Sequence, residues 1–233
     1  MSADRRKWVP ATILILTAHN LVQNSVLNEQ GYVSGNLAVS GLLVGVGRAA
    51  GLGWDEMGFA AGDTRKSLRI GAGAAVASAA LLVAALGRPR TRTLLQDERA
   101  STGSPRDIAR RSLLRFPLGT AMFEEVAFRG VLPALLRKSH RPLSAETVSA
   151  IAFGLWHLIP THRALEGNPI GRGRSSAQRG MATVVGATAA GVAGLALGWT
   201  RRATGSLLAP WLVHTALNIL SYLAAVTANR RRR

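Results

Sequence analysis

Two adjacent glutamates and an arginine interrupt an otherwise apolar stretch of this chain. Glu124, Glu125 and Arg129 lie near the middle of FPLGTAMFEEVAFRGVLPALL, residues 116–136. A charged side chain at the centre of a membrane helix costs about 2.5–3.5 kcal/mol, so all three must face a bundle interior or a wet cavity. Glu125 and Arg129 are four residues apart and can pair on one helix face, where Arg129 would neutralise and orient Glu125. Glu124 is rotated about 100° from Glu125 and has no partner in its own helix. It is therefore a candidate catalytic carboxylate, and the alternative is a charge cluster that only fixes helix packing.

Two later apolar stretches each carry a histidine with a neighbour four residues away. Phe153 and His157 lie in FGLWHLIP, and His214 and Asn218 lie in WLVHTALNIL. Residues four apart share a helix face, so each pair marks one side of a helix. Taken singly, a histidine in an apolar helix is more often a packing residue, and a polar pair can be interhelical glue. A carboxylate and two histidines on three different helices together predict one shared polar cavity.

Glu124, His157 and His214 fit two hydrolytic chemistries, and the residues leave the choice open. In the first, they bind a divalent metal such as Zn²⁺, because one Glu and two His form a known catalytic zinc set with an open position for water. In the second, no metal is needed: Glu124 and His157 activate a water as general base, while His214 and Asn218 donate hydrogen bonds to the developing oxyanion. The chain has no cysteine, no serine in a nucleophile-elbow pattern and no aspartate in an apolar span, which excludes the cysteine, elbow-serine and aspartyl-dyad mechanisms.

Helices must position these side chains, because the apolar stretches are long and lack strand-like alternation. The chain is 48% hydrophobic, and residues 70–87, 180–200 and 203–229 contain no charged side chain. Such runs are transmembrane candidates, and in lipid only helices or closed barrels satisfy the backbone. We expect an all-α polytopic membrane helix bundle with a polar intramembrane cavity, in one integral membrane domain (1–233) whose residues 112–228 form the catalytic core. About seven spans are expected, or eight with a half-buried helix: 8–28, 31–50, 69–87, 112–137, 145–161, 180–200 and 204–228.

The positive charge lies mostly between these spans. The 233 residues carry 29 Lys and Arg against 12 Asp and Glu, a net charge of +17. Many of the cations gather at 88–111, which we predict to be a long polar loop, at 162–179 and in the C-terminal arginines 230–233. Basic segments beside membrane spans contact anionic headgroups. The expected partners are therefore the lipid bilayer and a peptide or protein substrate, not nucleic acid, and the expected location is the cytoplasmic membrane.

Three motifs follow one another along the second half of the chain. FEEVAFRG (123–130), FGLWH (153–157) and HTALN (214–218) match the patterns EExxxR, FxxxH and HxxxN. In this order, on successive late helices, they resemble the CAAX protease and bacteriocin-processing family (CPBP, or Abi) of intramembrane proteases, which includes the Rce1-type prenyl-protein endopeptidases. The resemblance covers residues 112–228. It implies an all-helical membrane fold with a water-filled catalytic cavity and a working set of Glu124, His157, His214 and Asn218, with Glu124 as base or ligand.

These observations predict an intramembrane endopeptidase, either a metalloprotease or a glutamate-type protease, that cleaves membrane-associated peptides or proteins. Two alternatives stay open: a non-catalytic immunity or scaffold protein of the same fold, and a small proton-coupled transporter that uses the same carboxylate and histidines as a relay. Full biological activity of a Glu124→Gln variant would favour the scaffold. The protease hypothesis requires Glu124, His157 and His214 to converge to within about 5 Å of a shared point.

Overall fold

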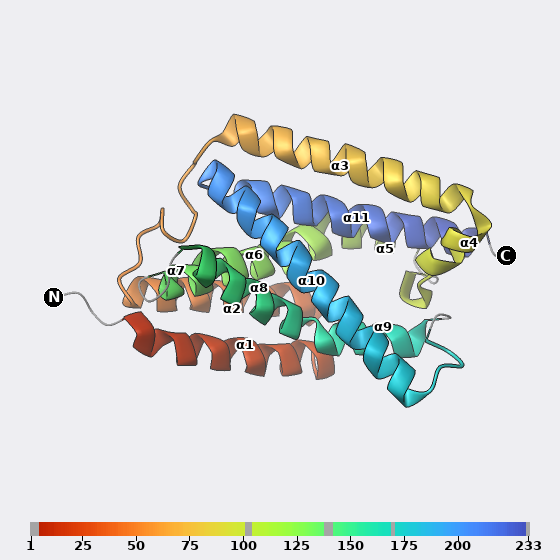
Figure 1. Ribbon diagram of the computed structural model, residues 1–233, viewed down its shortest axis with the longest axis horizontal. Helices are drawn as coiled ribbons and strands as arrows, with labels where there is room; N and C mark the ends of the chain where they lie inside the picture. Colours follow the sequence, from red (N-terminus) through yellow and green to blue (C-terminus); the bar gives the residue numbers. More distant parts are fainter. Residues whose placement is uncertain (1–4, 101–103, 138–141, 169–170, 232–233) are drawn as a thin grey trace.

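The computed structural model describes residues 5–100, 104–137, 142–168 and 171–231, and these ranges contain helices and no strand. The structure is 85% helical, which confirms the predicted all-α class. Figure 1 shows the elements along the chain. The principal helices are α1 (Trp8–Ser25), α2 (Glu29–Ala49), α3 (Thr64–Gly87), a composite helix over Pro105–Leu136, α8 (Pro142–Trp156), α9 (Leu158–Gly167), α10 (Ser176–Thr204) and α11 (Leu208–Arg230).

The composite helix carries the glutamates. It is built from α5 (Pro105–Arg110), η4 (Arg111–Met122), α6 (Phe123–Glu125), η5 (Val126–Val131) and α7 (Leu132–Leu136). The stretches η4 and η5 have the wide turns of a π-helix, a form found mostly as short pieces at functional sites. Every residue from Phe123 to Leu136 is buried. This helix is therefore the centre of the bundle, and its charges face protein rather than lipid.

The prediction of a long loop at 88–111 is wrong for its C-terminal part, because the composite helix begins there, at Pro105. Ser104 caps this helix: its hydroxyl accepts a bond from the backbone N–H of Asp107, and the Asp107 side chain accepts from the backbone N–H of Ser104. Pro105 at the first helical position is compatible with this start, because its missing N–H needs no partner there. The hydrogen bonds from Ser104 lower the pKa of the Asp107 carboxyl below its ordinary value. The remainder of 88–111 contains the short turns α4 (Pro89–Arg92), η2 (Thr93–Leu95) and η3 (Glu98–Ala100).

Three helices of the described ranges are long and apolar enough to cross a membrane: α3, α10 and α11. Little of their apolar surface is covered by the rest of the bundle, with 6% of the most apolar window buried in α3, 22% in α10 and 28% in α11. Val76, Leu81 and Val83 of α3 are 68–73% exposed. Side chains of this kind are stable on an outer surface when lipid covers them.

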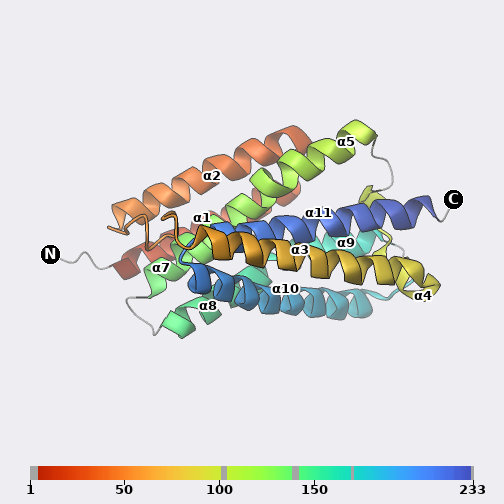
Figure 2. The same cartoon turned by 90° about the horizontal axis from the view of Figure 1, so that it is seen from above.

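The helices cross so that sequence-distant segments meet around the composite helix. The two views show α3 alongside α11, with α10 crossing obliquely beside α8 (Figures 1 and 2). The approach of α10 to α8 is close: a Cβ added at Gly154 would lie 2.9 Å from the carbonyl oxygen of Ala187. Glycine thus allows backbone contact between these two helices, as small residues do in membrane bundles.

The fifth predicted span, 145–161, is not one continuous helix. It breaks at His157, which lies in a turn between α8 and α9. The cause is Pro160: it has no N–H to donate to the carbonyl of Trp156, and its ring clashes with a carbonyl four residues earlier in a regular helix. The side-chain amide of Asn20, in α1, donates to this Trp156 carbonyl at 3.1 Å instead. The kink places His157 at the end of α8 rather than within a helix.

Candidate active site

Glu124 is the point on which the polar side chains converge. It is buried, with 5% of its surface exposed. Its Oε1 accepts a hydrogen bond from the indole Nε1 of Trp156 at 3.3 Å. Its Oε2 is also buried and accepts no hydrogen bond from the described residues. This oxygen lies 3.6 Å from Nε2 of His214 and 3.9 Å from Nε2 of His157. The three side chains expected to meet therefore do so within 5 Å.

Glu125 has a different environment from its neighbour. Its Oε1 accepts from Nη1 of Arg129 at 3.1 Å, the pair expected from their four-residue spacing. The same oxygen lies 2.7 Å from Nδ1 of His214. The Arg129 guanidinium stacks 4.0 Å from the centre of the Phe153 ring. Glu125 is thus charge-balanced by Arg129 and holds His214, whereas Glu124 forms no ion pair with an arginine or lysine of its own helix within the described residues.

The hydrogen bonds of the two histidines indicate which ring nitrogen carries the proton. Nδ1 of His157 lies 2.8 Å from the carbonyl oxygen of Phe153, which can only accept, so Nδ1 is the donor. Nδ1 of His214 is the donor to Glu125 for the same reason. In the neutral form each Nε2 then has a free lone pair. Both lone pairs face Glu124 Oε2. The Phe153 carbonyl and the Glu125 carboxylate fix the two rings through Nδ1, as such groups do for metal-binding histidines.

Two nitrogen lone pairs and a carboxylate oxygen repel one another unless a proton donor or a cation lies between them. These are the ligand types that zinc prefers, so the donor chemistry fits a divalent metal. In a tetrahedral site with bonds of about 2.0–2.1 Å, neighbouring donors are about 3.3 Å apart. The nitrogen–oxygen distances of 3.6 and 3.9 Å are wider, and within the described ranges no three His, Asp or Glu side chains have the spacing of a metal site. The same three atoms, which accept hydrogen bonds, also fit one water between them, because a buried water needs two to four polar partners.

Sequence reasoning missed Trp156 and the polar face of α1. Trp156 donates to Glu124 through its side chain and accepts from Asn20 through its carbonyl, so it links α1 to the carboxylate. His19 stacks on Trp156 and lies edge-on to Phe123, and its Nε2 is 2.5 Å from Oδ1 of Asn36 in α2. The available signal was the run of polar residues in an apolar helix, His19, Asn20, Gln23 and Asn24. Three of these, His19, Asn20 and Gln23, are buried.

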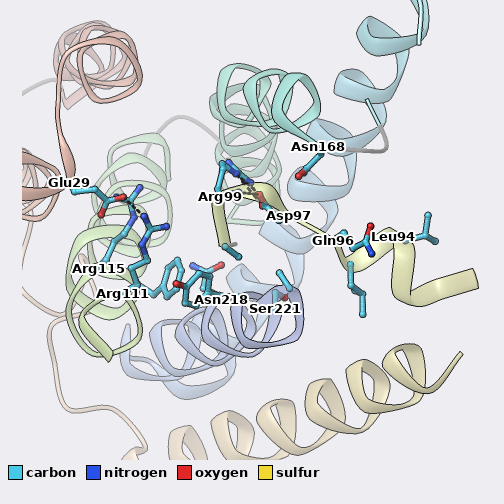
Figure 3. A pocket seen from close by; sticks show the side chains of 15 residues that line it. Glu29, Leu94, Gln96, Asp97, Arg99, Arg111, Arg115, Asn168, Asn218 and Ser221 are labelled. Atoms are coloured by element: carbon cyan, nitrogen blue, oxygen red, sulfur yellow. Dashed lines mark hydrogen bonds and ion pairs between the residues drawn. The ribbon is translucent and has the colours of Figure 1, made fainter. Parts of the chain in front are cut away.

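Asn218 lies apart from the two glutamates. It is on α11 one turn after His214, and within the described residues no hydrogen bond joins it to Glu124 or Glu125. It lines a cavity of about 710 Å³ with Ser221, as Figure 3 shows. The structure thus brings together Glu124, His157 and His214, with Glu125, Arg129 and Phe153 around them, and places Asn218 on the wall of the neighbouring cavity.

Comparison with known proteins gives a family. The family model described as Rce1-like, type II CAAX prenyl endopeptidase, matches residues 109–220. This range contains all three motifs and every residue of the cluster around Glu124 except those from α1 and α2. Searches of curated proteins and of solved structures gave no match. Residues 109–220 thus identify the chain as a membrane protein of the Rce1-like type II CAAX prenyl endopeptidase family, which is a family of proteases.

Proposed function

We propose that this protein is an intramembrane endopeptidase in which Glu124 activates a water held between His157 and His214. The observation that carries the proposal is Glu124 Oε2, a buried carboxylate oxygen that accepts no hydrogen bond from the described residues and faces two imidazole Nε2 atoms. Such an oxygen is available to take a proton in a low-dielectric site, where a correctly placed base contributes about 10²–10⁴-fold to the rate.

In the proposed step, the water donates one hydrogen bond to Glu124 Oε2 and the other to an imidazole Nε2, which leaves an oxygen lone pair directed at the peptide carbonyl carbon. As the new C–O bond forms, Glu124 takes the first proton and the carbonyl oxygen becomes an oxyanion. In this proposal Asn218, one helical turn from His214 on α11, donates a hydrogen bond to that oxyanion. When the C–N bond breaks, Glu124 returns the proton to the amine that leaves.

Other residues hold this geometry. Glu125, balanced by Arg129, fixes the ring of His214, and Phe153 fixes His157 through its carbonyl. His157 is the most exposed of the three central side chains, at 24%, against 9% for His214 and 6% for Glu124. Its face is therefore the side from which the substrate bond approaches. A divalent metal, when bound, would be held by Glu124, His157 and His214 and would lower the pKa of its water and polarise the carbonyl.

The proposed substrates are peptides or proteins associated with the bilayer. The exposed apolar surfaces of α3, α10 and α11 fit a lipid environment around the site, and the basic segments between the helices fit anionic headgroups at the membrane edge. A substrate segment in or beside the lipid can reach such a site, whereas nucleic acid is not an expected partner.

The test is peptide-bond cleavage by the full chain reconstituted in vesicles with a set of membrane-anchored fluorogenic peptides. Glu124→Gln keeps the shape of the side chain and the hydrogen bond from Trp156, and we expect it to lower kcat at least about 100-fold. Glu166→Gln, a surface change at a side chain that is 58% exposed, is the matched control and should cleave as the parent does. Cleavage is also measured after treatment with a chelator. A metal-dependent mechanism predicts that activity is lost and returns with Zn²⁺, whereas a metal-free mechanism predicts no loss. Full activity of Glu124→Gln would sink the proposal and favour a non-catalytic scaffold.

A further inference from the structure

A large cavity lies near the candidate site, and Asn218 of α11 is on its wall. Its volume is about 710 Å³, within the range of ligand pockets. The walls come from η4, from α11 and from the segment 94–100, and one of the lining residues, Asn218, lies one helical turn from His214. Figure 3 shows side chains from these separate elements pointing into a common space. The hydrolytic step proposed above uses only Asn218 from this cavity.

Positive charge is concentrated on the η4 wall. Arg110, Arg111 and Arg115 all pair with one carboxylate, Glu29, at 3.3, 3.0 and 2.7 Å. Arg110 lies outside the cavity lining, whereas Arg111 and Arg115 line it together with Glu29, so this group leaves an excess of one positive charge at the cavity. The other charged pair at the cavity, Arg99 with Asp97, is neutral as a pair. The cavity therefore carries a net positive wall that faces the neutral side chains of α11.

Two of these guanidinium groups are held in place and still have free donors. Arg115 lies 4.0 Å from the centre of the Tyr32 ring, and Arg111 lies 5.8 Å from that of Tyr222. Cation–π contacts of this kind fix a guanidinium plane. Both arginines line the cavity, with side chains 25% and 24% exposed. Each guanidinium has five N–H donors in a fixed fork, more than Glu29 alone can accept, so a second oxyanion can bind.

We propose that Arg111 and Arg115 bind a carboxylate of the peptide substrate and so select acidic residues at a set distance from the scissile bond. This inference rests on the proposed protease function. Arg115 and Arg111 precede Glu124 by nine and thirteen positions in one continuous helix. At 1.5 Å per residue these separations are at most about 14 and 20 Å, and an extended peptide advances about 3.3–3.6 Å per residue. The acidic residue therefore lies about four to six residues from the cleaved bond.

A peptide is the favoured source of the anion over a lipid. The arginines line a space enclosed by η4, α11 and segment 94–100 and lie on the same helix as Glu124. A peptide that has its scissile carbonyl at Glu124 must extend away from it, and this cavity includes Asn218, one helical turn from His214. A phosphate headgroup offers the same oxyanion chemistry, so the experiment has to separate the two sources.

The experiment uses the full chain in phosphatidylcholine vesicles, which supply no anionic lipid. A cleavable fluorogenic peptide is scanned with Glu or Gln at each position from two to eight residues on either side of the scissile bond, and kcat/KM is measured. We expect a Glu-over-Gln preference of about tenfold only near four to six residues, from charge-assisted hydrogen bonds, and mainly in KM. In Arg111→Gln and Arg115→Gln the ratio of kcat/KM for the Glu peptide to that for the Gln peptide should fall toward one. Arg115→Glu should instead prefer a peptide with Lys at that position. Arg65→Gln, at an exposed arginine of α3, should keep the parent ratio.

Three outcomes decide the proposal. The proposal is overturned if the parent has the same kcat/KM with Glu and with Gln at every position. It is also overturned if both arginine variants keep the parent's preference for Glu. If the arginine variants alter only the response to added phosphatidylglycerol, the ligand is a lipid phosphate and the peptide assignment is wrong. Failure of the protease function itself is separated by binding: the Glu124→Gln variant should bind a labelled acidic peptide more tightly than its Gln counterpart in fluorescence anisotropy. Binding with that preference but no cleavage by the parent supports the anion site and refutes the protease.

Discussion

The Trp156 indole is the described side chain that donates a hydrogen bond to Glu124, and its removal tests whether this hydrogen bond supports the carboxylate. Trp156→Phe deletes Nε1–H, which donates to Oε1 at 3.3 Å. Hydrogen bonds to charged groups contribute about 1.5–3 kcal/mol, and a distance of 3.3 Å, beyond the usual 2.7–3.2 Å, puts this one at the lower end. About 1.5 kcal/mol corresponds to roughly tenfold in rate. We therefore expect kcat to fall about tenfold.

A smaller ring also changes packing, because Trp156 contacts Phe123 and Phe128 at ring distances of 5.2 and 5.7 Å. A double-mutant cycle with Glu124→Gln removes this contribution, since the packing loss occurs in both backgrounds. A neutral amide oxygen accepts a weaker bond, so the cost of Trp156→Phe in unfolding free energy should be about 1 kcal/mol smaller in the Glu124→Gln background than in the parent. The free energies come from chemical denaturation in detergent micelles. A coupling below about 0.3–0.5 kcal/mol, the range of independent sites, would show that the indole does not support the carboxylate.

Three further changes follow from buried contacts. Asn20→Leu leaves the Trp156 carbonyl without its donor, and we expect a loss of about 1–3 kcal/mol of stability and a lower kcat, measured by denaturation and by cleavage rate. Arg129→Met leaves Glu125 as a buried charge without a counterion, which costs about 3–5 kcal/mol, and Glu125→Gln in the same chain should recover most of the lost unfolding free energy. Pro160→Ala allows α8 and α9 to join as one helix and should move His157, so that kcat falls while the melting temperature does not. An unchanged kcat in Pro160→Ala would mean that the kink is not needed for catalysis.

The residues of the candidate site were largely predictable from local sequence patterns. Charged and imidazole side chains are costly where an apolar helix faces lipid. The side chains of Glu124, His157 and His214 were therefore expected to face a common polar interior of the helix bundle. The four-residue spacing of Glu125 and Arg129 fixed their ion pair, because it depends only on helix geometry. The all-α class followed in the same way from long apolar runs without alternation. These features are set by residues close together in the chain, which is why a sequence determines them.

The division of roles between the two glutamates depends on contacts across the bundle. His214 bonds to Glu125 across 89 positions, and Asn20 reaches the Trp156 carbonyl across 136. The sequence left two roles open for His214, an oxyanion donor with Asn218 or a metal ligand with Glu124 and His157. The structure places His214 between the two glutamates and Asn218 on the cavity wall. Spacing along one helix cannot show how far that helix slides or rotates against its neighbours.

By itself, then, the sequence determined the residue types of the candidate site, the helical class of the elements that carry them and the family. Only the tertiary structure decided which imidazole nitrogen faces which oxygen, that Pro160 breaks a predicted span at His157, and that α1 supports Glu124 through Trp156. The physical reason is the range of the interactions. Helix formation and pairing at i,i+4 act within a turn, whereas the alignment of Glu124 Oε2 with two imidazoles is fixed by side-chain packing between helices that are far apart in the chain.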